Sequence, residues 1–345
     1  MNIHLPQLRI RNGHAQLQRR IFLQSSALAL LVPTPWSYAQ STAIEDAVWT
    51  DAARSRDIPV LIRWPAQAAQ GVVVYSHGMG GARDGADVWG KAWAQAGFVV
   101  LHLQHPDSDI EALRAGMGAL RVAMAPEQLL ARVADVKFAI DEIDRRRQPV
   151  ANTSGSALSS TAAGRWQTLL GLRIGVGGHS YGARSTQALA GLAYARGNNW
   201  SGSDSRVAAF LALSPALGKG TGLEQAKKDA SAITRPFMVA TGSLDGEVLG
   251  NGETPESRRM VFDALPAGRK ALLWLDGADH ASFAGNEKTM RSNALLRRDA
   301  QAIGKELVHH QLLALATTQW WKEQLAGAPL SAPTGLGASD VWLRR

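Results

Sequence analysis

Short runs of apolar, often β-branched residues recur along the chain between residues 60 and 275. Seven of them are separated by longer stretches of mixed character: 60–62, 72–75, 98–101, 173–176, 208–213, 237–240 and 271–275. Their apolar character is continuous rather than alternating, which is typical of strands that are buried on both faces of a sheet. We therefore expect these runs to form the central strands of one sheet.

In the stretches between these runs, apolar residues recur with the period of a helix. Helical periodicity extends over residues 87–95, 127–147, 183–195, 255–265 and, with breaks, 288–325. The stretch after Pro126, a favourable first-turn residue, places five apolar side chains near one side: Leu130, Val133, Val136, Phe138 and Ile140. Strands that alternate with helices predict an α/β fold, in which helices cover both faces of a mostly parallel sheet.

The first 39 residues have the features of an export signal. Residues 18–24 resemble the twin-arginine motif, because Arg19 and Arg20 precede an apolar stretch. That stretch, residues 25–32, is far shorter than the roughly 20 residues that a membrane-spanning helix needs, so we expect no stable membrane anchor. Ser37-Tyr38-Ala39 forms a small-x-small cleavage site. We expect the twin-arginine export machinery to be a partner, and residues 40–345 to form one domain that is periplasmic or secreted.

Composition and charge exclude several classes of protein. An apolar fraction of 46% and a charged fraction of 19% are typical of a globular chain and exclude intrinsic disorder. The absence of cysteine excludes disulfides, thiolate metal sites and a cysteine nucleophile. The net charge of +8 includes four arginines in the first 39 residues. The remaining small excess is spread along the chain, and we therefore expect no nucleic-acid partner.

A Gly-x-Ser-x-Gly motif occupies residues 178–182, directly after the apolar run 173–176 and directly before a helical stretch. Strand, sharp turn and helix is the context of a nucleophile elbow, which exposes a serine at the carboxyl end of a parallel sheet. Ser180 is therefore the candidate nucleophile. The same glycines do not fit a dinucleotide-binding fingerprint, because serine occupies the third glycine position. With no phosphate-binding loop or metal-ligand set in the sequence, we expect no cofactor and no metal.

A serine nucleophile needs a base and an acid, which in this type of fold follow it in the order serine, acid, histidine. Asp245 follows the run 237–240, and His280 follows the run 271–275. These two residues are the candidate acid and base. Glu247 and Asp276 remain as alternatives for the acid.

The remaining requirement is a pair of donors for the oxyanion of the reacting carbonyl. The glycine-rich stretch 76–81 follows the run 72–75, where this kind of fold provides its first donor. The candidate donors are the backbone amides of Met79 and Tyr181, the residue after the nucleophile. His77 lies beside these glycines, and we expect it to shape the loop by hydrogen bonding.

These motifs resemble the α/β-hydrolase superfamily, and in particular the bacterial proteins called predicted dienelactone hydrolases, which are related to platelet-activating-factor acetylhydrolases. The resemblance runs from about Arg56 to Leu343 and rests on six segments: 58–60, 64–65, 76–81, 105–108, 178–183 and 277–280. It implies hydrolysis of esters by a serine enzyme without metal or organic cofactor.

Two positions depart from these relatives. Dienelactone hydrolases proper use a cysteine nucleophile, which this chain lacks. The acetylhydrolases carry their acid after the strand that follows the elbow helix, where this chain has Leu213-Ser214-Pro215 and no carboxylate. The acid is therefore expected one strand later, at Asp245.

We expect an exported serine hydrolase that cleaves carboxylic esters, small or lipid-like, through an acyl-enzyme. The same three residues are compatible with an amidase, a peptidase or an acyltransferase, since the motifs do not encode the acceptor. A non-catalytic binding protein on a hydrolase scaffold is the alternative of another class. We expect residues 106–126 and 151–164 to shape the substrate site, with Leu113, Met117 and Met124 as candidates for an acyl pocket.

Overall fold

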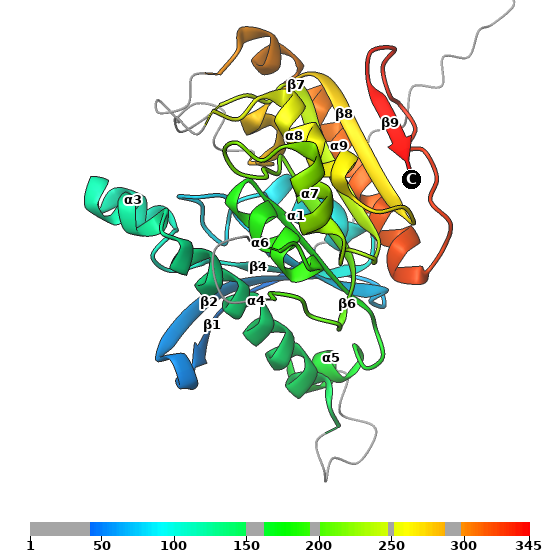
Figure 1. The fold of residues 1–345 in the computed structure, drawn as a ribbon. Helices are drawn as coiled ribbons and strands as arrows, with labels where there is room; N and C mark the ends of the chain where they lie inside the picture. Colours follow the sequence, from blue (N-terminus) through cyan, green and yellow to red (C-terminus); the bar gives the residue numbers. More distant parts are fainter. Residues whose placement is uncertain (1–41, 150–161, 194–200, 248–251, 287–297) are drawn as a thin grey trace, which may run out of the picture. The chain divides into compact units, whose positions relative to one another are not determined.

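A nine-stranded sheet runs through the described part of the chain, with the strand order β1-β2-β4-β3-β5-β6-β7-β8-β9 (Figure 1). The strands are β1 (Ala43–Asp51), β2 (Arg56–Trp64), β3 (Gly71–Ser76), β4 (Phe98–Leu103), β5 (Ile174–His179), β6 (Val207–Leu213), β7 (Phe237–Leu244), β8 (Lys270–Asp279) and β9 (Val341–Arg344). Neighbours from β4 to β8 are parallel, whereas β1–β2, β2–β4 and β8–β9 are antiparallel.

The computed structural model describes residues 42–149, 162–193, 201–247, 252–286 and 298–345. These residues belong to one unit, Gln40–Arg345. The expected export signal, residues 1–39, and most of the loop 151–164 lie outside the described residues.

All seven apolar runs are strands, so the prediction of a mostly parallel sheet is confirmed. The two strands that the pattern did not reveal, β1 and β9, lie at the edges of the sheet. In β1 exposed residues alternate with more buried ones, and β9 is only four residues long. An edge strand is exposed along one side and needs no continuous apolar run, which explains why the sequence pattern missed both.

The helices are α1 (Asp87–Gln95), α2 (Ile110–Arg114), α3 (Met117–Ala123), α4 (Pro126–Arg147), α5 (Ala162–Gln167), α6 (Tyr181–Ala190), α7 (Leu223–Ala230), α8 (Pro255–Ala264) and α9 (Ala300–Ala326). Two expectations need correction. The helix expected over 183–195 ends at Ala190, because Gly191 adopts a φ of 113° and closes it. Leu130 is 43% exposed and does not belong to the buried side of α4, where Val133 and Val136 lie.

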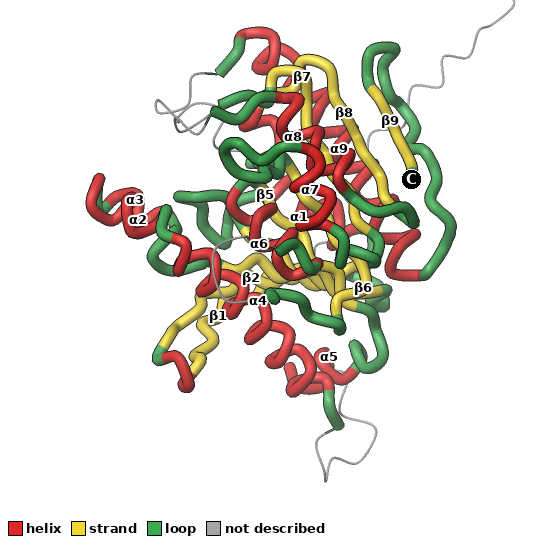
Figure 2. Tube along the Cα trace, in the orientation of Figure 1, coloured by secondary structure: helices red, strands yellow, loops and turns green. Residues whose placement is uncertain are grey.

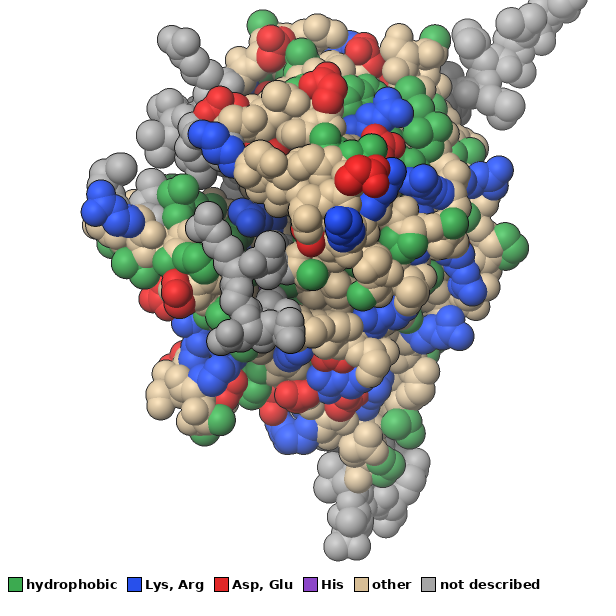
Figure 3. Space-filling model, viewed as in Figure 1, with side chains coloured by type: hydrophobic (Ala, Val, Ile, Leu, Met, Phe, Trp, Pro, Cys, Tyr) green, Lys and Arg blue, Asp and Glu red, His purple; other side chains and the backbone are tan. Residues whose placement is uncertain are grey.

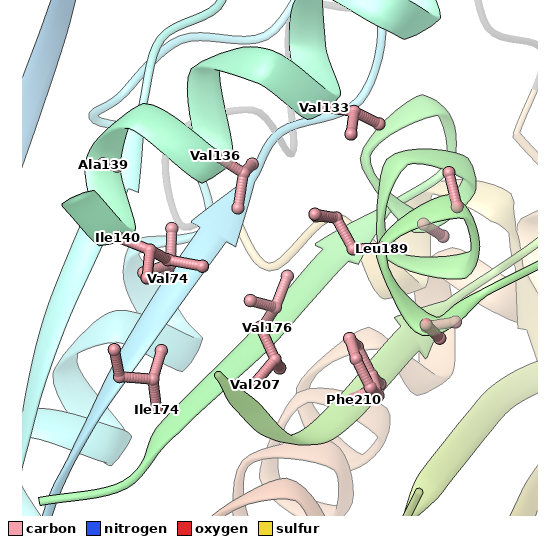
Figure 4. Close-up of a cluster of buried hydrophobic side chains, with 14 of the residues drawn as sticks. Val74, Val133, Val136, Ala139, Ile140, Ile174, Val176, Leu189, Val207 and Phe210 are labelled. Carbon is pink, nitrogen blue, oxygen red and sulfur yellow. The ribbon is translucent and has the colours of Figure 1, made fainter. Parts of the chain in front are cut away.

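Side chains along each strand point alternately to the two faces of the sheet, and an apolar core lies on each face. One core packs α4, α5, α6, α7 and α8 against one face, and the other packs α1 and α9 against the opposite face (Figures 1 and 2). In the first core, Val133, Val136 and Ile140 of α4 lie over Val74 and Val176 of the sheet (Figure 4). This packing fixes the sheet rigidly, and therefore also the loops that leave its strands.

The carboxyl ends of the parallel strands lie at one edge of the sheet, since β3, β5, β6, β7 and β8 all run in the same direction. The residues just beyond or at these ends come from five separate segments of the chain: His77, Ser180, Ser214, Asp245 and His280. Ligand sites of open α/β sheets form at this edge. The topology therefore brings the candidate catalytic residues together at the carboxyl ends of the strands.

The surface seen in Figure 3 carries basic and acidic side chains interspersed with apolar ones. Val122 and Met124, at the end of α3, are each 54% exposed. Among the described residues, no helix is both long enough and apolar enough to cross a membrane.

Candidate active site

Ser180 sits at the sharp turn between β5 and α6, in a backbone conformation that is unusual for a residue with a side chain. Its φ is 54° and its ψ is −112°. The turn is tight because a side chain at Gly178 would collide with Gly182, and one at Gly182 would collide with the backbone of Ser76. Only glycine fits at either position. This strained backbone conformation exposes the serine side chain at the carboxyl end of the sheet, as in a nucleophile elbow.

His280 joins the hydroxyl of Ser180 to the carboxylate of Asp245. Its Nε2 lies 3.0 Å from Ser180 Oγ, and its Nδ1 lies 3.0 Å from Asp245 Oδ1. The ring is held at the start of a 3-10 turn, His280–Phe283, where Asp279 and Ser282 form a capping box. With Nδ1–H donating to the carboxylate, Nε2 is left as an acceptor facing the serine hydroxyl. The structure thus brings together the three residues that were singled out as nucleophile, base and acid.

The carboxylate of Asp245 is completely buried and fully hydrogen-bonded. Thr241 Oγ1 donates to Oδ2 at 2.8 Å, and Ser214 Oγ donates to Oδ1 at 2.9 Å. The guanidinium of Arg258 lies 2.9 Å from Oδ1. Burial by itself raises the pKa of Asp245, but the hydrogen bond with His280 and the charge of Arg258 outweigh it and hold the pKa below its ordinary value. The acid therefore stays ionised beside the imidazole.

Arg258 and Ser214 were not singled out from the sequence. Arg258 lies on α8 and is 2% exposed, and it also donates to the backbone carbonyls of Asp245, Pro215 and Gly246. It thereby ties the ends of β6 and β7 together. Ser214, with a φ of 50°, occupies the position directly after β6, at the carboxyl end of that strand. The lack of a carboxylate at this strand end was visible in the sequence and was the one available signal for Ser214.

His179 packs against His280 from the nucleophile side. The two rings are 4.7 Å apart, and His179 Nε2–H donates to the backbone carbonyl of His280 at 3.1 Å. Burial, followed by the charge of His280, lowers the pKa of His179 to about 3. His179 is therefore neutral in the folded protein and serves to seat the backbone of His280.

The loop after β3, which was expected to carry the first oxyanion donor, lies beside Ser180. A Cβ placed on Gly78, the residue before Met79, would lie 3.1 Å from His179 Nδ1 and 3.4 Å from the Cβ of Ser180. Tyr181 is the first residue of α6, whose amino end faces the same place. The amide groups of a helix amino end have no partners within the helix and attract negative charge.

His77 shapes this loop, as the sequence suggested. Its Nε2 accepts a hydrogen bond from the amide of His105 at 3.0 Å, and its Nδ1 lies 2.5 Å from the carbonyl of Gly78. Burial, and then the charge of Arg132, holds the pKa of His77 well below its ordinary range. A neutral ring with these two bonds is a structural group and not a second base.

The alternative acid Asp276 and two further histidines, His309 and His105, have other partners. Asp276 pairs with Lys305 at 3.0 Å and accepts from Ser243, and His309 lies on α9 and hydrogen-bonds the carbonyl of Asp276. His105 is fully buried, with Nδ1 bound to Asp135 at 2.9 Å. Within the described residues, no group of three or more His, Asp or Glu side chains is arranged to hold a metal ion.

The segment 106–126 contains α2 and α3 and is tied to the loop that follows β3. The amide of Gly80 donates to the carbonyl of Ser108 at 2.9 Å, and the amide of Ile110 donates to Gly81 at 2.9 Å. Leu113 packs over Gly80, where a Cβ would lie 3.0 Å from its methyl group. This segment therefore borders the site, although Met124 points its side chain largely to solvent.

Comparison with known proteins supports the fold. No protein-family model matches the sequence, and no curated protein matches it. The solved structure of 2,6-dihydroxy-pseudo-oxynicotine hydrolase is similar with a TM-score of 0.52 and 15% identity, over 87% of this chain and 73% of that one. A cold-adapted esterase from an Arctic intertidal metagenomic library aligns with a TM-score of 0.48 and 14% identity, over 83% and 96% of the two chains.

Strand order, parallel register and the turn at Ser180, together with the first of these similarities, define the α/β-hydrolase fold. The predicted fold class is confirmed. Because one fold supports many activities, the activity has to be argued from the residues at the carboxyl edge of the sheet.

Proposed function

We propose that the protein is a serine hydrolase that cleaves carboxylic esters through an acyl-enzyme. The proposal rests above all on His280, whose two ring nitrogens each lie 3.0 Å from their partners, Ser180 Oγ and Asp245 Oδ1. A serine hydroxyl at neutral pH is a poor nucleophile, and a histidine oriented by a buried carboxylate is the arrangement that activates it.

In the first half of the reaction Ser180 Oγ attacks the ester carbonyl carbon while His280 Nε2 takes the hydroxyl proton. The carbonyl oxygen becomes an oxyanion that accepts hydrogen bonds from the amides of Met79 and Tyr181. The imidazolium then protonates the leaving alcohol, and the carbon–oxygen bond of the ester breaks. Asp245 keeps the imidazole in the productive tautomer and stabilises its positive form.

In the second half water attacks the acyl-enzyme, with His280 again acting as the base. The proton passes back to Ser180 Oγ as the carboxylic acid leaves. The structurally similar protein with a TM-score of 0.52 is named a hydrolase, which agrees with this chemistry.

The direct test is a panel of nitrophenyl esters of increasing acyl length, assayed beside amide and peptide substrates and with an alcohol added as competing acceptor. We expect ester hydrolysis, lost by at least about 10⁴-fold in Ser180→Ala. Faster turnover of amides than of esters indicates the amidase alternative, and transfer to the alcohol indicates an acyltransferase. No turnover by a folded wild type supports the binding-protein alternative.

We also propose that the enzyme acts in the periplasm after twin-arginine export and that the mature chain begins at Gln40. Support for this comes from Arg19, Arg20 and the small-x-small site that ends at Ala39. Mass spectrometry of the protein from a periplasmic fraction tests it. A mature amino terminus at Gln40, abolished when Arg19 and Arg20 are changed to lysine, is expected; the intact chain in the cytoplasm contradicts it.

A further inference from the structure

Arg132 of α4 is fully buried and takes no part in the mechanism above. Its Nη2 donates to the backbone carbonyl of His77, and its Nη1 donates to Ser108 Oγ at 2.9 Å. Its guanidinium carbon lies 4.7 Å from the centre of the Tyr181 ring, a cation–π arrangement. A buried arginine with these partners requires an explanation, since burying a charge is costly.

The three partners belong to the three segments that surround the expected oxyanion. His77 lies two residues before Met79, on the loop after β3. Tyr181 carries the second expected donor in its own backbone. Ser108 belongs to the segment that hydrogen-bonds Gly80 on the far side of the same loop. One rigid side chain therefore spans both expected donors and the segment behind them.

A second set of hydrogen bonds, made by His105 and Asp135, holds the start of the same loop. His105 Nε2 lies 3.0 Å from Ser76 Oγ at the end of β3, and its Nδ1–H donates to Asp135, which is completely buried. Asp135 lies three residues after Arg132 on α4 and also binds Arg54 and Arg56, each at 2.8 Å. Helix α4 is thus fixed to the end of β3 at two positions, three residues apart on the helix.

The charge of Arg132 is retained in the folded protein. Burial lowers its pKa to about 10, which still leaves the guanidinium protonated at neutral pH. Its carboxylate neighbour Asp135 is already bound by two other arginines. A fixed positive charge in a buried position is felt strongly by negative charge that develops nearby.

We propose that Arg132 is a positioning residue of the oxyanion hole: it holds the Met79 loop and Tyr181 at a fixed spacing and adds positive potential there. This rests on the proposed function. Arg132 touches no reacting atom, and its effect is exerted through the two backbone donors. A role confined to folding would instead lower stability without selectively weakening the binding of an oxyanion.

The test compares Arg132→Lys and Arg132→Met with a matched arginine, Arg235. Arg235 also donates to a backbone carbonyl, Val207 O at 2.7 Å, and stacks on a ring, Phe210 at 4.9 Å. It does so at the amino end of β6, the edge of the sheet away from Ser180. Arg235→Lys and Arg235→Met are therefore controls for the loss of a half-buried arginine that donates to a backbone carbonyl and stacks on a ring.

Four quantities are measured for each variant: kcat and KM on a nitrophenyl ester, the inhibition constant of a trifluoromethyl ketone, and the thermal midpoint. Ser180 Oγ adds to the ketone carbon, its proton passes to His280, and the carbonyl oxygen becomes an alkoxide in the oxyanion hole. We expect the Arg132 variants to lose kcat by about 10- to 100-fold, with a matching rise in the inhibition constant and KM within about threefold. The Arg235 variants should lose thermal stability but keep the wild-type kcat and the wild-type inhibition constant of the ketone.

Ser108→Ala removes one anchor of Arg132 with a small change in volume, and keeps the test decisive where an Arg132 variant does not fold. It should raise the inhibition constant and lower kcat by about 2- to 10-fold. Unchanged kcat and ketone affinity in a folded Arg132 variant, or in Ser108→Ala, overturns this inference alone. A wild type that neither hydrolyses esters nor binds the ketone overturns the proposed function and this inference with it.

Discussion

The hydroxyl of Ser214 lies 2.6 Å from Nδ1 of His280, closer than the carboxylate oxygen of Asp245 at 3.0 Å. Ser214 also donates to that carboxylate at 2.9 Å, so imidazole, hydroxyl and carboxylate form a closed triangle. Ser214 comes from the end of β6 and Asp245 from the end of β7. The base is therefore oriented from two strand ends, although only one of them carries a charge.

Replacing Ser214 by alanine removes two of these hydrogen bonds and leaves the ionised carboxylate with one partner fewer. We expect kcat to fall by about tenfold, since a hydrogen bond to a charged group is stronger than an ordinary one. Ser243→Ala is the control, because Ser243 binds Asp276 and the amide of Gly277 and does not touch the triangle. Steady-state kinetics of both variants test this expectation. Equal losses of kcat in the two variants would mean that Ser214 does not orient His280.

Arg258 holds Asp245 in place from α8, and its neighbour Arg259 provides a control on the same helix. Breaking a buried ion pair costs about 3–5 kcal/mol, so Arg258→Met should destabilise the fold strongly and lower kcat in whatever folds. Arg259 makes only a 3.6 Å pair with Asp263, with its side chain 45% exposed. Arg259→Met should change the free energy of unfolding by less than about 0.5 kcal/mol. Urea unfolding measures both, and similar small effects would refute the positioning role given to Arg258.

The elbow leaves no room for a side chain at Gly182, where a Cβ would strike the backbone of Ser76. Gly182→Ala should therefore destabilise the protein by about 2–3 kcal/mol or more, because backbone has to move. Gly304 lies within α9 with open space around it. Gly304→Ala should stabilise by about 0.5–1 kcal/mol through helix propensity. A thermal scan that ranks the two substitutions in the opposite order contradicts the geometry of the turn.

The sequence predicted the central strands and three of the candidate site residues, because each of them leaves a recognisable pattern along the chain. The central strands are buried on both faces, so each leaves a continuous apolar run; the edge strand β1 leaves only an alternating one. Ser180 was found from the Gly-x-Ser-x-Gly motif that follows such a run, and Asp245 and His280 from their position after later runs in the expected chain order.

Arg258 and Arg132 could not be found in this way. Each lies on an amphipathic helix, and the sequence does not distinguish a buried arginine from an exposed one such as Arg259. Both arginines donate to backbone carbonyls of distant loops, and such carbonyls carry no mark in the sequence. Only the packing of α4 and α8 against the sheet reveals them.

Buried histidines make the fold sensitive to acid. Burial lowers the pKa of His102 and His179 to about 3 and that of His105 to about 4, from an ordinary value of 6.5. Because the unfolded chain takes up these protons first, stability is complete above pH 6.5 and is lost as the pH falls below it. Each such histidine should remove about 1.4 kcal/mol between pH 7.5 and pH 5.5.

A single variant isolates this effect. His102 lies on β4. In His102→Gln the free energy of unfolding should depend on pH less steeply than in the wild type. The loss between pH 7.5 and pH 5.5 should be smaller by about 1.4 kcal/mol, the contribution of one histidine. Urea titrations at both pH values measure the difference. Parallel pH profiles for the two proteins would show that His102 is not held neutral by the fold.

Covalent labelling of Ser180 by a fluorophosphonate, located by mass spectrometry, tests most directly whether His280 activates that serine. The phosphorus should be found on Ser180 of the wild type, with no adduct in Ser180→Ala and labelling slowed by at least about 10³-fold in a folded His280→Gln. An unlabelled native protein, a label on another residue, or a rate that does not depend on His280 would contradict it.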